Sequence, residues 1–245
     1  MILDRSGARI GVLVPFTNCN LEPDMMALCP PGCTVHFARM GGYDVDEIPG
    51  SDQMAGLGAS DISETLRLLS GVRPAIVLYG CTSATLTHGS RFDRDLAARM
   101  KTGSGAISIT AAGALVAALR ALDVTRVGFA SPYLGEINDQ AERFLRGAGI
   151  KVVQRADIGR ILDNYGQGEL TPDDVFDLAL RADHTEAQAI VLSCTDMRSV
   201  EAIERIETAL GKPVVTSNQA MVFEVMRALK CPRHDGLPGV LFDQL

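Results

Sequence analysis

The chain has 245 residues and a formal net charge of −7; 47% of its residues are hydrophobic, 5% are aromatic and none is tryptophan. This composition is that of a soluble globular protein long enough to bury its own core. Lys and Arg form no cluster, which argues against a nucleic-acid partner. No apolar stretch is long enough for a membrane helix, and the N-terminus lacks the features of a signal peptide. We therefore expect a cytoplasmic protein that binds no membrane.

The six cysteines are predicted to be free thiols, because they are too sparse for a disulfide scaffold and a cytoplasmic compartment keeps thiols reduced. Cys19, Cys29 and Cys33 lie close in sequence, but they form no C-x-x-C pair, and the four histidines are scattered. The chain also lacks the glycine-rich motifs that bind nucleotides and the H-E-x-x-H motif of zinc enzymes. We therefore expect neither a metal site nor a cofactor.

Short apolar segments alternate with helix-length amphipathic stretches, a pattern typical of parallel β-sheets flanked by helices. The expected strands are Ile10–Val14, Val35–Ala38, Ala75–Tyr79, Ala106–Ile109, Arg126–Ala130, Lys151–Gln154, Ala189–Ser193 and Pro213–Thr216. The segments Ser60–Glu64 and Thr171–Asp174 each have the residues that open a helix, the second with Pro172 in the first turn. Residues 41–58 contain glycine, proline and acids and predict a long loop, either a lid or a surface excursion.

An internal repeat links three pairs of segments in the same order. Arg9–Phe16 corresponds to Arg126–Tyr133, since each has a basic residue, an apolar strand containing glycine, a proline and an aromatic residue. Ala75–Thr82 corresponds to Ala189–Thr195, and both run from a buried strand directly into a Cys-Thr pair. Residues 108–122 correspond to residues 214–229, each with a strand, a Thr-containing turn and a helix ending in Arg-Ala-Leu.

The repeat predicts an α/β fold of two lobes related by a pseudo-twofold axis, with a mostly parallel sheet flanked by helices in each. The N-terminal lobe is expected at residues 1–110 with Cys81, and the C-terminal lobe at residues 111–225 with Cys194. The end of the last helix and the tail, residues 226–245, are expected to pack back on the body or on a neighbouring subunit. We expect a homo-oligomer, either a dimer or a tetramer.

The repeated cysteines predict a site in the cleft between the lobes. Ligands of open parallel sheets bind beyond the carboxyl ends of the strands, and Cys81 and Cys194 both fall there. Each cysteine precedes a predicted helix start, whose free amides lower a thiol pKa and bind a carboxylate. Two thiols on opposite sides of a substrate can exchange protons on its two faces, and a thiolate can also add to an activated double bond.

At these residues the sequence resembles the aspartate/glutamate (hydantoin) racemase superfamily, and within it the branch of maleate cis-trans isomerases and arylmalonate decarboxylases. The resemblance extends from Gly11 to about Leu229. Its motifs are Gly11–Asn18 with Glu22, Tyr79–Cys81, Ser131–Tyr133, Asp163–Asn164 and Ser193–Cys194. It implies an isomerase that needs no cofactor and converts maleate or a related small dicarboxylate to fumarate.

The resemblance also implies roles for individual residues. Cys81 would add to the double bond of maleate and form a covalent succinyl-type intermediate, and Cys194 would exchange the proton on the other side. The residues implied to hold the carboxylates of the substrate are Asn18, Tyr133 and Asn164, with the backbone and hydroxyls around Thr82, Ser83 and Thr195.

The residues after the two cysteines depart from the isomerase pattern. Cys81 is followed by Thr-Ser and Cys194 by Thr-Asp, which is closer to the racemases of amino acids and hydantoins. A racemase of aspartate, glutamate, hydantoin or a related derivative is therefore the alternative enzyme. A decarboxylase is disfavoured, because arylmalonate decarboxylases keep only the second cysteine. The non-enzymatic alternative is a bilobed module that binds small carboxylates, in which both cysteines would be dispensable.

Three further residues have two interpretations each. His88 either assists the Cys81 thiol or lies on a helix surface. Asp196 and Arg198 belong either to the rim of the site or to a solvated face.

Overall fold

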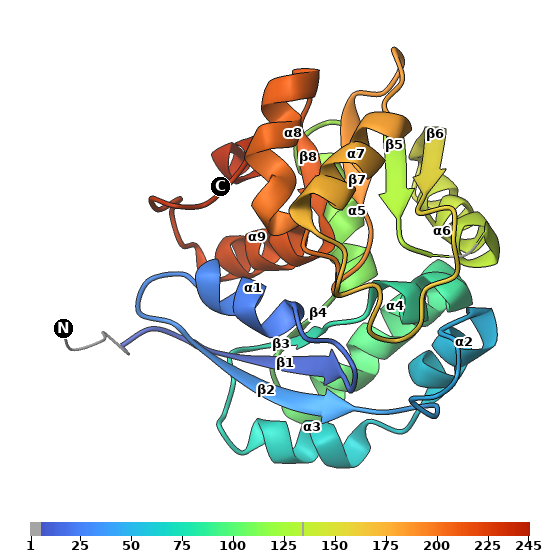
Figure 1. Ribbon diagram of the computed structural model, residues 1–245. Coiled ribbons are helices and arrows are strands. Elements are labelled where there is room, and N and C mark those ends of the chain that lie inside the picture. Colours follow the sequence, from blue (N-terminus) through green and yellow to red (C-terminus); the bar gives the residue numbers. More distant parts are fainter. Residues whose placement is uncertain (1–5, 134) are drawn as a thin grey trace.

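The computed structural model describes residues 6–133 and 135–245 and has two four-stranded parallel sheets flanked by helices (Figure 1). The first sheet contains β1 (Arg9–Pro15), β2 (Thr34–Met40), β3 (Ile76–Tyr79) and β4 (Ile107–Thr110). The second contains β5 (Arg126–Ser131), β6 (Lys151–Asp157), β7 (Ala189–Leu192) and β8 (Val214–Thr216). The predicted fold class and all the predicted strands are confirmed, with ends that shift by up to three residues.

The two sheets have the same topology. Their strand orders are β2-β1-β3-β4 and β6-β5-β7-β8, so each strand of the first sheet has a counterpart four strands later. In each sheet the chain passes from its first strand, β1 or β5, to a neighbouring strand on one side and then to a neighbouring strand on the other side. The crevice at such a reversal of strand order is where parallel sheets bind ligands. In the first sheet this crevice lies between the ends of β1 and β3.

Helices cover both faces of each sheet (Figure 1). In the first half of the chain they are α1 (Leu21–Ala27), α2 (Ser51–Ala59), α3 (Ser63–Ser70), α4 (Thr82–Ser104) and α5 (Ala111–Ala121). In the second half they are α6 (Gly135–Gly147), α7 (Pro172–Ala182), α8 (Ile203–Leu210) and α9 (Ser217–Leu229), with 3₁₀ turns at Val200–Ala202 and Val240–Gln244.

Alternation along the central strands separates two hydrophobic cores. In β1, Ile10 and Val12 contribute to one buried cluster and Leu13 to the other, because successive side chains of a strand point to opposite faces. Equivalent strands behave alike: Val127 and Phe129 of β5 join the first cluster and Ala130 the second. The first cluster also contains residues of α5 and α9 and therefore joins the two halves of the molecule.

The helix starts predicted at Ser60–Glu64 and Thr171–Asp174 are confirmed. Thr171 caps α7 in a capping box with Asp174, and Pro172 is the first helical residue. Helix α3 begins at Ser63, whose amide donates to Asp61 Oδ1 at 2.9 Å. The Thr-containing turns of the repeat are also N-caps, since Thr110 accepts a hydrogen bond from Gly113 N and Thr216 from Gln219 N.

The prediction of a loop from residue 41 to residue 58 is wrong in its second half, where α2 spans Ser51–Ala59. Its glycines hid the helix, because glycine has a low helix propensity. They are needed for packing: a Cβ at Gly58 would lie 2.6 Å from the carbonyl oxygen of Ala84 in α4. Met54 and Leu57 are the buried apolar residues that hold α2 in place.

The tail packs against the second half of the chain. Gln219 Nε2 in α9 donates to Pro238 O at 3.0 Å, and the ring centroid of Phe223 lies 6.4 Å from that of Phe242. None of the helices in the described residues has the length and apolarity needed to cross a bilayer. Residues 1–5, which belong to the segment tested for a signal peptide, lie outside the described residues. The lobe boundary at residue 110 and the homo-oligomer stay predictions.

Candidate active site

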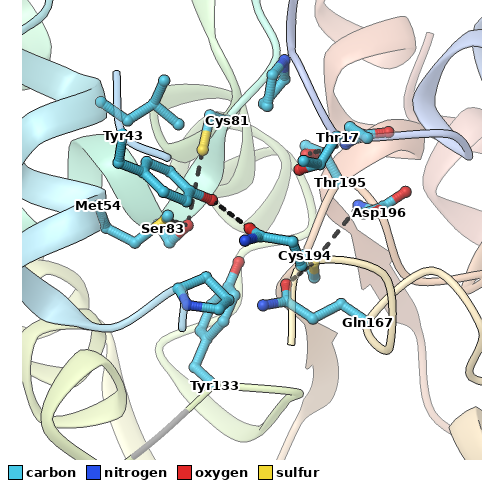
Figure 2. Close-up of a pocket in the computed structure, with 15 residues that line it drawn as sticks. Thr17, Tyr43, Met54, Cys81, Ser83, Tyr133, Gln167, Cys194, Thr195 and Asp196 are labelled. Atoms are coloured by element: carbon cyan, nitrogen blue, oxygen red, sulfur yellow. Dashed lines mark hydrogen bonds between the residues drawn. The ribbon is translucent and has the colours of Figure 1, made fainter. Parts of the chain in front are cut away.

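One small cavity, of about 40 Å³, lies where the carboxyl ends of β1 and β3 meet the ends of β5 and β7 (Figure 2). It is lined by Pro15, Thr17, Asn18, Tyr43, Pro49, Met54, Leu57, Cys81, Ser83, Tyr133, Asn164, Gln167, Cys194, Thr195 and Asp196. Both repeated cysteines are therefore part of the same cavity. So are five of the six residues predicted to hold a carboxylate, the exception being Thr82.

Cys81 is the N-cap residue of α4 and is 5% exposed. Its Sγ lies 3.6 Å from Ser83 Oγ. Burial raises the pKa of the Cys81 thiol, while hydrogen bonds from the backbone amides of Ala84 and Ser83 act in the opposite direction. The helix start predicted after this cysteine is confirmed. However, its amides do not lower the thiol pKa below the ordinary value, because desolvation is the larger effect.

Cys194 lies in a different setting. No helix begins beside it: a turn follows, a 3₁₀ turn begins at Val200 and α8 begins only at Ile203, so the predicted helix start is wrong. The thiol donates to Gln167 Oε1 at 3.4 Å and accepts a hydrogen bond from Asp196 N at 3.4 Å. Burial, followed by the nearby Asp196 carboxylate, raises the pKa of Cys194 to about 12. The residue is therefore a neutral thiol near pH 7.

Thr195 connects the two cysteine-bearing strand ends. Its hydroxyl donates to Gly80 O at 2.9 Å, next to Cys81, and accepts from Asn18 Nδ2 at 3.0 Å. Asn18 in turn accepts from Leu21 N at the start of α1, at 2.9 Å. The Asn18 side chain thus satisfies an N–H at the start of α1 and also lies at the site. This chain of hydrogen bonds holds the halves of the site in register.

Asp196 lies in the site and not on a solvated face. Its Oδ1 accepts hydrogen bonds from Cys19 N at 2.9 Å and Asn20 N at 3.0 Å. Burial raises the pKa of the carboxyl to about 6, although these hydrogen bonds lower it. Figure 2 shows the backbone N–H of Asp196 directed toward Cys194. Arg198, by contrast, pairs with Glu201 at 2.8 Å and does not line the cavity.

Tyr133 forms the wall of the cavity on the side of the second lobe. The residue is 5% exposed, and its hydroxyl faces the cysteines in Figure 2. Burial raises the pKa of the Tyr133 phenol well above its ordinary value, and the neighbouring Cys194 and Cys81 add to this effect. The phenol is therefore a hydrogen-bond donor at any physiological pH. Ser83 lies on the facing wall and donates to Met54 Sδ at 3.0 Å.

Asn164 closes the cavity by binding the loop that precedes α2. Its Oδ1 accepts from Tyr43 Oη at 2.7 Å, and its Nδ2 donates to the carbonyls of Val45 and Glu47, both at 2.7 Å. Tyr43 itself packs edge-on against Phe16, with 5.2 Å between the ring centroids. In this structure the amide of Asn164 therefore holds protein groups, and a carboxylate would compete with them.

Thr82 and His88 lie outside the cavity. The Thr82 hydroxyl donates to Ser217 Oγ at 2.8 Å, which joins α4 to α9 behind the site. Thr82 therefore supports the site from behind. His88 contacts Ala55 O at 2.8 Å and stacks on Phe92, with 4.1 Å between the ring centroids, so it does not assist Cys81.

Sequence reasoning missed four polar or flexible residues of the cavity: Thr17, Tyr43, Met54 and Gln167. Thr17 could have been predicted from the sequence, since it precedes Asn18 at the end of β1. Gln167 also had a signal, because it follows Asn164 by three residues in the turn-forming sequence Asp-Asn-Tyr-Gly-Gln-Gly. Tyr43 and Met54 come from the segment interpreted as a loop and had no signal of their own.

The lining contains neither Lys, Arg nor His, so an anionic substrate would be held by neutral donors such as hydroxyls, amides and backbone N–H groups. Among the lining residues, the thiols of Cys81 and Cys194 are the groups that can both form a covalent bond to carbon and transfer a proton near neutral pH. Across the described residues, no cluster of three or more His, Cys, Asp or Glu side chains is arranged to hold a metal ion.

Comparisons with known proteins cover nearly the whole chain. The family model described as arylmalonate decarboxylase matches residues 10–242. A maleate isomerase of Nocardia farcinica is 30% identical over 234 residues, 91% of each chain. The crystal structure of a Pseudomonas putida S16 maleate isomerase variant with maleate superposes with a TM-score of 0.88 at 25% identity, covering 97% of this chain and 98% of the other.

A further solved structure bears on the cysteines. It is a cysteine-to-serine variant of the Nocardia farcinica maleate cis-trans isomerase with a covalently bound succinylcysteine intermediate. It superposes with a TM-score of 0.87 at 25% identity and covers 97% of this chain and 99% of that one. In that relative, a cysteine forms a covalent bond to a four-carbon dicarboxylate.

Proposed function

The chain belongs to the arylmalonate decarboxylase family, and within it we propose that this protein is a maleate cis-trans isomerase that works without a cofactor. The observation that carries the proposal is the presence of Cys81 and Cys194 in the lining of one cavity. A decarboxylase that keeps only the second cysteine has no use for Cys81. The relatives described above are maleate isomerases, so the racemase alternative is not favoured.

The size of the cavity supports a small substrate. Its volume of about 40 Å³ is far below the roughly 300–1,000 Å³ of pockets that enclose drug-sized ligands. A four-carbon dicarboxylate is among the smallest substrates with an activated double bond. An arylmalonate would add an aromatic ring to two carboxylates and would need a larger cavity.

The proposed reaction begins with addition of the Cys81 thiolate to one alkene carbon of maleate. The electron pair of the double bond moves toward the other alkene carbon and its carboxylate, and the Cys194 thiol donates its proton there. The resulting succinyl thioether has a single bond where the double bond was, and this bond rotates. Cys194 then takes the proton back, the bond between carbon and Cys81 Sγ breaks, and fumarate and the Cys81 thiolate are released.

The environments of the two thiols support this division of roles. Burial raises the pKa of Cys81 as well, but the amides at the start of α4 lie beside its sulfur and act against this rise, in favour of the thiolate needed for addition. Cys194 is kept protonated by burial and by Asp196, as a proton donor must be. A pair of equivalent residues with different environments is the usual way in which an enzyme separates a nucleophile from an acid.

The two carboxylates of maleate would be bound by neutral donors. The Tyr133 hydroxyl and the amide of Asn18 line the cavity on its two sides, and the amides that follow Cys81 lie between them. Asn164 would exchange its bonds with the loop for bonds to the substrate. Ser83 and Thr195 complete the lining, and Thr82 supports it through Ser217. A cytoplasmic location stays a prediction.

Proton NMR of the purified protein in D₂O tests the proposal. With maleate, a fumarate vinyl signal should appear, and it should be absent with the variants Cys81→Ala and Cys194→Ala. With each enantiomer of aspartate and glutamate, the α-proton signal should persist. Loss of an α-proton signal with a silent vinyl region would make the protein a racemase. No change in the spectrum with any of these compounds would contradict both reactions and favour the binding module.

A further inference from the structure

Gln167 occupies a position in the cavity that the reaction described above does not use. It follows β6, in a turn closed by hydrogen bonds from Gly168 N and Glu169 N to Tyr165 O, at 2.9 and 3.2 Å. The first half of the chain fixes this turn, because Asn20 Nδ2 donates to Gly168 O at 3.0 Å. The turn is therefore tied to both lobes, and the side chain of Gln167 starts from a defined place.

Close packing around Gly168 adds to this restraint. A Cβ at Gly168 would lie 3.0 Å from Cys19 Sγ, 3.1 Å from Asn20 Nδ2 and 3.1 Å from Asp196 Oδ2. The backbone beside Gln167 thus lies so close to the Asp196 network that a side chain at Gly168 would require its neighbours to shift. Gln167 is held against Cys194 by the same contacts that hold the lobes together.

The two ends of the Gln167 amide face different groups. Oε1 accepts a hydrogen bond from the Cys194 thiol at 3.4 Å. Figure 2 shows Nε2 on the opposite side, directed into the cavity toward Tyr133. Because Cys194 is a neutral thiol near pH 7, its hydrogen needs an acceptor, and the amide oxygen supplies one. The amide nitrogen then has to donate, and in the cavity it can donate to a carboxylate.

We propose that Gln167 is a specificity-determining residue that orients the Cys194 thiol through Oε1 and binds, through Nε2, the substrate carboxylate beside the carbon that Cys194 protonates. The second half of this inference rests on the proposed isomerase function, whereas the contact with Cys194 does not. One amide thereby links recognition of the carboxylate to the position of the proton donor.

The proposal predicts discrimination between a carboxylate and a carboxamide. A donor at this position favours maleate over maleamate, its monoamide, because a hydrogen bond to a charged carboxylate is stronger than one to a neutral carboxamide oxygen. Gln167→Glu replaces the donor by a negative charge, which repels the maleate dianion and accepts a hydrogen bond from the amide of maleamate.

Steady-state kinetics with maleate and maleamate test this proposal. In Gln167→Glu the ratio of kcat/KM for maleate to that for maleamate should fall by about a hundredfold, mainly through KM for maleate. Gln167→Met, which keeps the length without a donor and with only a weak acceptor, should lower the ratio by about tenfold. Gln154→Glu introduces the same charge on β6 outside the cavity and should leave the ratio unchanged. An equal loss for both substrates in the Gln167 variants would overturn the proposal.

A second measurement reads the contact with Cys194 without any turnover. In a Cys81→Ser background, the rate of Cys194 alkylation by iodoacetamide at pH 9 should fall about tenfold in Gln167→Glu, because a carboxylate beside the thiol raises its pKa. Gln154→Glu should not change it. An unchanged rate in Gln167→Glu would refute the contact. If the wild type does not isomerise maleate, the proposed function fails, and the alkylation rates still decide whether Gln167 acts on Cys194.

Discussion

The strand ends that carry Cys81 and Cys194 begin alike and finish differently. Residues 75–78 and residues 189–192 have the same sequence, Ala-Ile-Val-Leu. The first lobe then has two residues before its cysteine and the second has one, and the carbonyl of the additional residue, Gly80, accepts the hydrogen bond from Thr195. After the cysteine, the first lobe starts a helix at once and the second makes a turn. The repeat positions both sulfurs, and the residues after them give each thiol its role.

The electrostatic contrast follows from these two endings. Helix α4 presents backbone N–H groups to Cys81, and these favour a thiolate. The turn after Cys194 also directs backbone N–H groups, those of Asp196 and Met197, at the sulfur, but it brings the Asp196 carboxylate close and holds the thiol against Gln167. A duplicated α/β unit has thus produced a nucleophile and a proton donor from the same residue type, through local backbone conformation.

Removing either thiol is expected to have the largest effect. Cys81→Ala and Cys194→Ala should each lower kcat for maleate by roughly 10⁴-fold or more, because covalent catalysis needs both. Substitutions of the two cysteines should differ in whether the covalent intermediate accumulates. After incubation with maleate, Cys194→Ser should carry a mass increase of one maleate on Cys81, and Cys81→Ser should carry none. Intact-protein and peptide mass spectrometry measure this directly.

The reverse pattern, with the adduct on Cys194, would exchange the two roles. Cys231→Ser is a matched control, because this thiol lies outside the cavity and its loss should leave the rate unchanged. A rate loss there would point to a fault in folding.

The two threonines that follow the cysteines provide the next contrast. Thr195→Val should lower kcat/KM by about ten- to a hundredfold, because the hydroxyl that joins Gly80 to Asn18 is lost. Thr82→Val should leave kcat/KM within about threefold, because its partner Ser217 lies behind the site. Both should lower the free energy of unfolding by about 1–3 kcal/mol, as expected for a buried hydrogen bond. Kinetics and urea unfolding of the two variants would show the difference, and equal kinetic losses would contradict it.

Asp196→Asn should bring the two thiols closer in reactivity. The carboxylate raises the pKa of both cysteines, as the second largest cause for Cys194 and the smallest for Cys81. Its removal should therefore speed alkylation of Cys194 by about tenfold at pH 9 and that of Cys81 by less. Peptide mass spectrometry separates these sites from the exposed Cys19. An equal increase in the alkylation rates of both thiols would show that Asp196 does not cause the difference between Cys81 and Cys194.

Asp196 should also make stability depend on pH. Its folded pKa of about 6 lies above the ordinary value near 3.9, so the folded state binds the proton more tightly than the unfolded state. The stabilisation is complete below about pH 4 and is lost as pH rises through 6. Between pH 7 and pH 5 the free energy of unfolding should rise by about 1.4 kcal/mol through Asp196 and by a similar amount through Asp24, whose pKa is also about 6.

Urea unfolding at the two pH values tests this dependence. Asp196→Asn should reduce the rise by about 1.4 kcal/mol. The variant should itself fold, because the amide oxygen can still accept from Cys19 N and Asn20 N. An undiminished rise in this variant would show that the carboxyl is not protonated in this interval.

The sequence allowed the strands, the lobes and the cysteines to be predicted because each depends on local pattern. Strands such as Ile76–Tyr79 are continuous apolar runs, and the repeat aligned Cys81 with Cys194 at their ends. What could not be predicted depends on packing between distant segments. Helix α2 is stable because Gly58 lets it approach α4 closely, and the raised pKa of Cys194 reflects burial by both halves. Neither the packing of α2 nor the burial of Cys194 can be predicted from a local sequence pattern.

The smallest expected effects concern the caps of α5 and α9, where the lobes remain most alike. Thr216→Ala removes the N-cap of α9 and should lower the free energy of unfolding by about 1 kcal/mol. Thr110→Ala removes the equivalent cap of α5 and also the partner of the buried Asp93 carboxylate, to which Thr110 Oγ1 donates at 2.5 Å. It should therefore cost about 1–3 kcal/mol more. Urea unfolding measures both, with the serine variants as controls that keep the hydroxyl; equal losses would mean that Asp93 does not need Thr110, and the lobes would be symmetric away from the cysteines.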